Sequence, residues 1–74
     1  MPQYIVNKNA QFNGDHEVHV TPRSACSSPH YPNLENQEWL GEHSTCHGAV
    51  REARNRGYVK ANGCYYCANA CHTG

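Results

Sequence analysis

Residues 64–74 read Cys64-Tyr65-Tyr66-Cys67-Ala68-Asn69-Ala70-Cys71-His72-Thr73-Gly74 and hold three of the five cysteines of this 74-residue chain. Their cysteine and histidine side chains follow the pattern C-x2-C-x3-C-H. A C-x2-C step lets one tight turn direct two thiolates at the same point, and Zn²⁺ is bound well by such thiolates in a tetrahedral set. The pattern predicts a structural zinc site in this part of the chain.

The predicted metal ligands are Cys26, Cys64, Cys67, Cys71 and His72. Four protein ligands would close the site and make it structural, whereas three would leave one position open for a catalytic water. The fourth ligand stays open among Cys26, His30, Cys46 and His72. Cys26 is attractive because it lies in a long predicted loop, and a shared metal would tie that loop to the cysteine-rich segment.

Two thiol chemistries are alternatives to metal binding. Cys64 and Cys67 have the spacing of a thiol–disulfide exchange motif, but such motifs activate the first thiol at a helix N-terminus, and Cys64 follows a predicted strand. Cys46 lies between His43 and His47 in the first turn of a predicted helix, where a thiolate is stabilised. It also falls on the apolar face of that helix, where a cysteine packs as a small core residue. A thiol-dependent enzyme or redox protein therefore remains an alternative function.

Two further interpretations concern covalent cross-links. Attachment of haem needs C-x2-C-H, and the segment from Cys67 to His72 is one residue too long. A disulfide-stapled domain is possible, although the odd number of cysteines leaves at least one unpaired in a monomer. Whether the cysteines are metal-bound, disulfide-bonded or free is left open.

The composition explains why a cross-link of some kind is expected. The chain has one Trp, one Phe and one Met, and at this length a hydrophobic core rarely supplies more than ~3–5 kcal/mol. Small domains of this kind are usually supplemented by a metal, by disulfides or by oligomerisation. The cysteines are the obvious source of the supplement.

Charge and hydropathy restrict the partners. Six basic and six acidic residues give a formal net charge of zero, which argues against a general binder of nucleic-acid phosphates. A protein partner is therefore the expectation. No stretch approaches the ~20 apolar residues of a membrane span, and the first residues lack the apolar region of a secretion signal. We expect a cytoplasmic protein without membrane association, a compartment in which clustered cysteines more often bind metal than form disulfides.

Secondary-structure signals divide the chain into four segments of one predicted domain, 1–74. Residues 4–20 read as a β-hairpin, because Asn13-Gly14 tolerates the turn and residues 16–20 alternate. In that alternation His16 and His19 point to opposite faces and cannot chelate one ion together. Residues 21–43 are predicted to be a long proline-containing loop, from which Trp39 packs onto the core.

The second half of the chain carries the clearest helix signal. Residues 44–56 combine a good N-cap, Ser44, with apolar positions at helical spacing and Gly57 just past the end. Residues 58–74 are predicted to hold a third strand and the cysteine cluster. The fold class is therefore α+β, a small β-β-α-β domain with an antiparallel sheet of about three strands and one helix on a face. We expect a zinc-binding module used in binding or assembly, of unknown cellular role.

Overall fold

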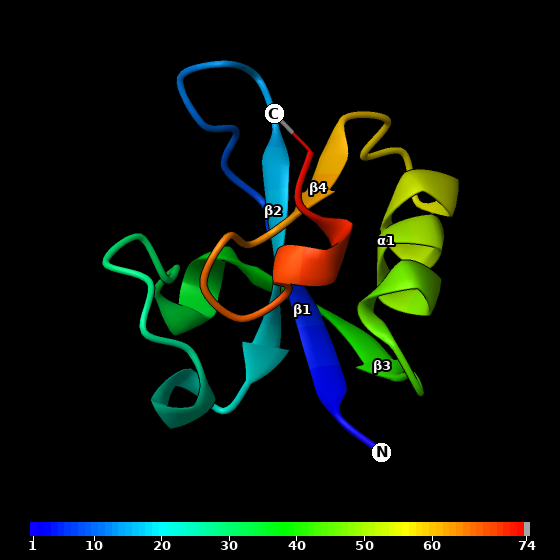
Figure 1. The fold of residues 1–74 in the computed structure, drawn as a ribbon. Helices are drawn as coiled ribbons and strands as arrows, with labels where there is room; N and C mark the ends of the chain where they lie inside the picture. The colour runs from blue at the N-terminus through cyan, green and yellow to red at the C-terminus, as the bar shows by residue number, and fades with distance from the viewer. Residues whose placement is uncertain (74) are drawn as a thin grey trace.

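A computed structural model describes residues 1–73, and Gly74, the last residue of the predicted cysteine segment, lies outside the described residues. The chain forms one α-helix packed on a four-stranded sheet (Figure 1). The elements are β1 (Gln3–Asn7), β2 (His16–Thr21), β3 (Gln37–Glu42), α1 (Cys46–Asn55) and β4 (Ala61–Gly63), with short 3₁₀ turns η1 (Arg23–Ala25), η2 (Leu34–Asn36) and η3 (Asn69–Cys71).

The sheet has the strand order β3-β1-β2-β4. Strand β1 pairs antiparallel with both β2 and β3, and β2 pairs parallel with β4. The predicted α+β class is confirmed, but the sheet has four strands and is mixed rather than antiparallel. A connection that contains a helix can return the chain in its original direction, which a tight turn cannot do, and α1 precedes β4 in this way.

The predicted hairpin is confirmed. Tyr4 pairs with Val20 and Val6 pairs with Val18. Gly14 lies in the connection with φ +90°, a conformation that glycine adopts at little cost.

The predicted helix is confirmed, with its buried face as expected. Its buried residues are Cys46, Ala49, Val50 and Ala53, the positions that the helical period selects. The helix ends before Gly57, whose φ of +106° is the left-handed conformation common just past a helix. The N-cap is Thr45 instead of Ser44.

The segment predicted to be a loop, 21–43, differs from the structure in its last third. Residues Gln37–Glu42 form β3, which pairs with β1. Trp39 was expected to pack on the core, and that expectation was wrong, because its side chain is 59% exposed. The strand was not recognised because its hydrogen-bonding partner, β1, lies some thirty residues earlier in the chain, and isolated strand propensity is weak.

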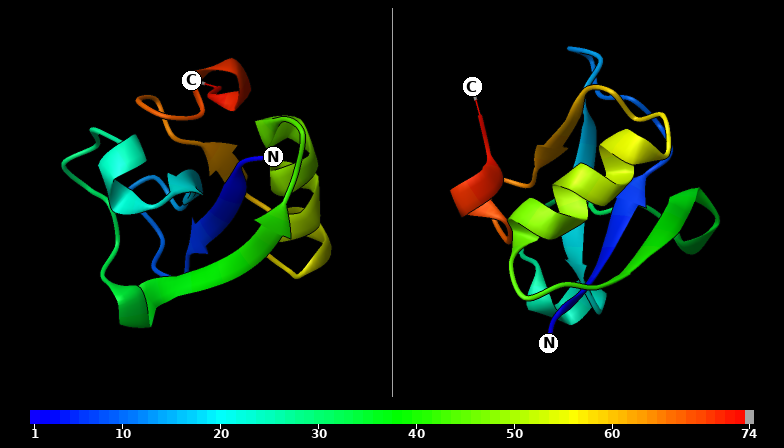
Figure 2. Two further views of the ribbon diagram at one scale, coloured as in Figure 1. Left: turned by 90° about the horizontal axis from the view of Figure 1, so that it is seen from below. Right: turned by 90° about the vertical axis from the view of Figure 1, so that its right-hand side faces the viewer.

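Both faces of the sheet are covered. Helix α1 lies on one side and the segment from residue 22 to residue 36 lies on the other, as both views in Figure 2 and the view in Figure 1 agree. Adjacent strand residues point to opposite faces, and the adjacent Val18 and His19 are both fully buried. A histidine therefore lies at the centre of the molecule.

Candidate metal centre

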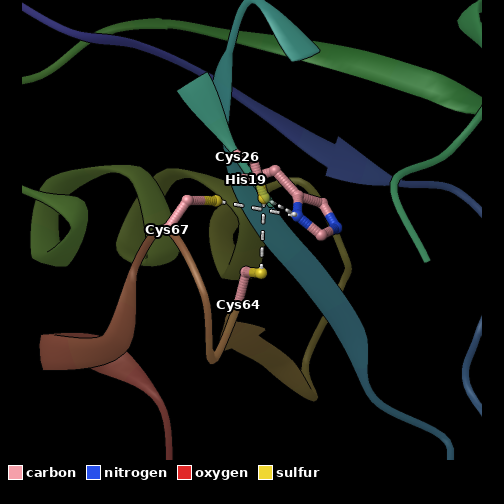
Figure 3. Close-up of side chains that lie close together, drawn as sticks. All are labelled: His19, Cys26, Cys64 and Cys67. Atoms are coloured by element: carbon pink, nitrogen blue, oxygen red, sulfur yellow. Dashed lines mark hydrogen bonds between the residues drawn. The ribbon is translucent and has the colours of Figure 1, made fainter. Parts of the chain in front are cut away.

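Four side chains converge beside β2: His19, Cys26, Cys64 and Cys67 (Figure 3). One ligand atom from each of them lies within 4.8 Å of every other. The three cysteines carry free thiols. A histidine and three cysteines are a donor set typical of structural zinc sites, so this group is positioned to bind a metal ion.

The separations between the ligand atoms match the edges of a small tetrahedron. Cys26 Sγ lies 3.7 Å from His19 Nδ1 and 3.7 Å from Cys64 Sγ, and Cys67 Sγ lies 3.8 Å from His19 Nδ1. Zinc bonds of about 2.3 Å to sulfur and about 2.0–2.1 Å to nitrogen give tetrahedral edges of about 3.8 Å between sulfurs and about 3.6 Å between sulfur and nitrogen. Three of the six separations therefore match a tetrahedral zinc site, and the other three are at most 4.8 Å.

Three separate parts of the chain supply these ligands. His19 is held by β2, and Cys26 follows the turn η1. Cys64 comes directly after β4, and its backbone N–H donates to the carbonyl of Val18 at 2.9 Å, which extends the β2–β4 pairing by one residue. The sheet therefore fixes the positions of His19 and Cys64 relative to each other.

Backbone N–H groups from β2 and from the C-x2-C turn donate hydrogen bonds to the two sulfurs of this turn. The N–H of Tyr66 donates to Cys64 Sγ at 3.4 Å, and the N–H of Val20 donates to Cys67 Sγ at 3.3 Å. Strand β4 pairs with β2 only as far as Val18, which leaves the N–H of Val20 available. Hydrogen bonds to sulfur favour its anionic, metal-binding form.

Burial acts against the charged form of three of these side chains. It raises the pKa of the thiols of Cys64 and Cys67 and lowers the pKa of His19 from 6.5 to about 4. The uncharged forms are therefore favoured when the centre holds no cation. A bound divalent cation would reverse this preference for the thiols, because it supplies the positive charge that thiolates need.

The second ring nitrogen of His19 is informative. His19 Nε2 is the one buried side-chain nitrogen or oxygen within residues 1–73 that has no hydrogen-bond partner. The nearest carboxylate oxygen is Glu17 Oε1, at 3.6 Å. If Nδ1 binds a metal, the proton resides on Nε2, and a closer approach of about 0.5 Å would let it donate to Glu17. Carboxylates often orient metal-binding histidines in this way.

The structure brings three of the five predicted ligands, Cys26, Cys64 and Cys67, to this centre. It takes Cys71 elsewhere, into a disulfide with Cys46 on α1. Its neighbour in sequence, His72, uses Nδ1 to contact the carbonyl oxygen of Gly63 at 2.9 Å and packs its ring against Tyr65. His30, considered as a fourth ligand, is exposed.

Sequence analysis missed His19. The alternation of residues 16–20 puts His19 on the face opposite His16, and its ring packs against Tyr31 at 5.0 Å between centroids. The alternation excludes joint chelation by His16 and His19, but it does not exclude a contact of one of them with cysteines from elsewhere in the chain. The available signal was a histidine on the strand face opposite the valines, followed seven residues later by Cys26.

Comparison with known proteins finds no family model that matches the chain, and no curated protein or solved structure with significant similarity to it. None of the helices formed by residues 1–73 has the length and apolar character needed to cross a bilayer.

Proposed function

We propose that this protein is a structural zinc-binding module in which His19, Cys26, Cys64 and Cys67 bind one Zn²⁺. The observation that carries the proposal is the agreement of three ligand-atom separations, 3.7, 3.7 and 3.8 Å, with the edges of a tetrahedral zinc site. In this proposal His19 takes the place of Cys71 and His72, the ligands expected from the sequence, since Cys71 is bonded to Cys46.

The energetic role of the ion follows from the size of the domain. Structural zinc contributes about 10–16 kcal/mol in peptide systems at neutral pH, against the ~3–5 kcal/mol that a core of this size supplies. The proposed ion would join β2, the segment after η1 and the segment after β4. The ion would add to the pairing of β2 with β4, which is short because β4 is only three residues long.

A role in binding or assembly is favoured over catalysis. Four protein ligands leave no coordination position for a substrate or a reactive water. A redox or nucleophilic thiol needs a lowered pKa, whereas burial raises the pKa of Cys64 and Cys67. Cys46, the other candidate nucleophile, is in a disulfide. The disulfide-stapled alternative is compatible with the zinc module, because the two cross-links use different cysteines.

A protein partner and a cytoplasmic location complete the proposal. The net charge of zero gives little attraction for nucleic-acid phosphates. Trp39, Tyr65 and Tyr66 are more than half exposed, and aromatic residues are enriched where proteins bind one another. A reducing compartment such as the cytoplasm would keep the three ligand cysteines as thiols and would also favour the reduced form of Cys46 and Cys71.

The test is zinc stoichiometry by native mass spectrometry, on oxidised protein purified without a chelator. We expect one zinc per chain, lost on acid denaturation. The Cys64→Ser variant should carry none, while the matched variant His30→Ala, which changes an exposed histidine outside the centre, should carry one. A wild-type mass without metal, or an unchanged zinc content in Cys64→Ser, would refute the proposal.

A further inference from the structure

A second group of metal-binding side chains lies where η3 meets the start of α1. One ligand atom each from Cys46, His47 and Cys71 lies within 4.8 Å of the others. These residues come from two segments far apart in sequence, with Cys46 and His47 in the first turn of the helix. None of them belongs to the His19 centre, so this group is a separate candidate.

In the structure the two sulfurs of this group form a disulfide, with the two Cα atoms 6.2 Å apart. Two thiolates bound to one Zn²⁺ have their sulfurs about 3.8 Å apart. Rotation of the side chains can provide that separation without moving the backbone far. The disulfide and the metal would therefore be alternative cross-links at the same place.

We propose that reduction of the Cys46–Cys71 disulfide creates a second zinc site, with Cys46, Cys71 and His47 as its protein ligands. Two molecules of a thiol reductant form a disulfide and supply two electrons and two protons, the S–S bond breaks, and Cys46 and Cys71 become thiols. Each thiol releases its proton to solvent as it binds the ion. The imidazole of His47 binds in its neutral form.

The surroundings favour this chemistry. The positive end of the dipole of α1 is at Cys46 and favours an anionic sulfur there. His47 is exposed and Cys71 is half-buried, so a reductant and an ion can reach the group from solvent. In the first centre Cys64 is fully buried and only Cys67 is half-buried.

The fourth coordination position would face solvent. A surface pocket of about 370 Å³ is lined by His47 and Cys71 together with Arg51 and Arg54. Because three protein ligands leave one position for water or a small anion, the second site would be open and its ion exchangeable. The proposed zinc at the His19 centre is closed by four protein ligands. The second site does not depend on the first.

The test compares zinc bound by oxidised and reduced protein. Protein is reduced with a phosphine, which becomes a phosphine oxide by taking oxygen from water, and the phosphine is removed under anaerobic conditions. Zn²⁺ is then titrated and the stoichiometry is read by native mass spectrometry. We expect one zinc per oxidised chain and two per reduced chain. With Co²⁺, the thiolate charge-transfer absorbance should rise in proportion to three thiolates in the oxidised form and five in the reduced form.

Two histidine variants identify the site. His47→Ala changes an exposed side chain, so folding and the disulfide should persist, and the second zinc of the reduced protein should bind at least about tenfold more weakly. His30→Ala, also exposed, should keep both. One zinc in both redox states, or two tight zincs in reduced His47→Ala, would overturn the proposal. No zinc in the oxidised form, with one in the reduced form that His47→Ala removes, would support this site and refute the His19 centre.

Discussion

Replacing His19 separates its role as a metal ligand from its role as a buried side chain. His19→Ala removes the nitrogen ligand, whereas His19→Cys replaces it with a sulfur ligand and could complete a site of four cysteines. Both changes shorten a fully buried residue and remove the ring contact with Tyr31. The two variants should therefore lose comparable packing and differ in zinc binding.

The magnitude has two parts. Deleting a large buried side chain costs about 2–4 kcal/mol whether or not metal is present. Loss of one of four ligands should weaken zinc affinity at least as much as loss of an outer-shell partner, about 10–100-fold, which corresponds to about 1.4–2.7 kcal/mol. With free zinc in excess, the stability that zinc adds should fall by the same amount in His19→Ala.

The assay is urea unfolding of oxidised protein at fixed protein concentration, with buffered free zinc and with a chelator. The difference between the two free energies of unfolding isolates the zinc-dependent part. We expect it to shrink in His19→Ala and to recover largely in His19→Cys. If His19→Ala gained as much stability from zinc as the wild type does, His19 would not be a ligand and the proposed centre would be refuted.

Three further changes test other parts of the structure. A Cβ atom on Gly63 would lie 2.5 Å from the backbone oxygen of Ala68 and 2.7 Å from Cys71 Cβ, so Gly63→Ala should displace the cysteine segment and lower both zinc content and disulfide yield, read by mass spectrometry. Metal-free protein should keep its stability above pH 6.5 and lose about 3 kcal/mol as the pH falls to about 4. Burial lowers the pKa of His19 from 6.5 to about 4, so the unfolded chain binds a proton in this range before the folded chain does. Urea unfolding measured against pH checks this, and an equal loss in His19→Ala would contradict it. Replacing Cys46 and Cys71 with serine removes a cross-link between positions 25 apart and should lower the unfolding free energy of the oxidised protein by about 3–4 kcal/mol, while a change below about 1 kcal/mol would contradict the loop-entropy argument.

The elements that depend on local pattern could be predicted from the sequence. Helix α1 was found because its apolar residues recur at the helical period and Gly57 follows it, and both signals act within about four residues of chain. A third strand was expected within residues 58–74, and the structure limits it to β4, Ala61–Gly63; its direction was predicted wrongly. Parallel pairing with β2 depends on the path of the intervening helix, which no local signal specifies.

The candidate site was predicted only where its members are close in sequence. Cys64 and Cys67 were found by their spacing, and Cys26 by the need to tie down a long loop. Which of Cys26, Cys46 and Cys71 joins Cys64 and Cys67 at the site depends on which segment of the chain covers which face of the sheet. Cys71 is the last residue of η3, which lies against α1, and there it meets Cys46. The spacing of the cysteines contains no information about that contact.

The positions of the two cross-links explain how so small a core can hold three layers. The segment from Cys64 to Cys71 runs from the His19 centre, which also includes Cys26 of the layer opposite α1, to the disulfide on α1. A single stretch of eight residues therefore connects the layers on both sides of the sheet. His19 and Cys64 of the inner connection are fully buried, and only the outer connection contains a bond that a reductant cleaves. A reductant should therefore act on the disulfide and leave the proposed inner zinc in place. Reduction would then loosen the attachment of α1, unless a second ion replaces the disulfide. A comparison of the unfolding free energy of reduced protein with and without zinc distinguishes these two outcomes.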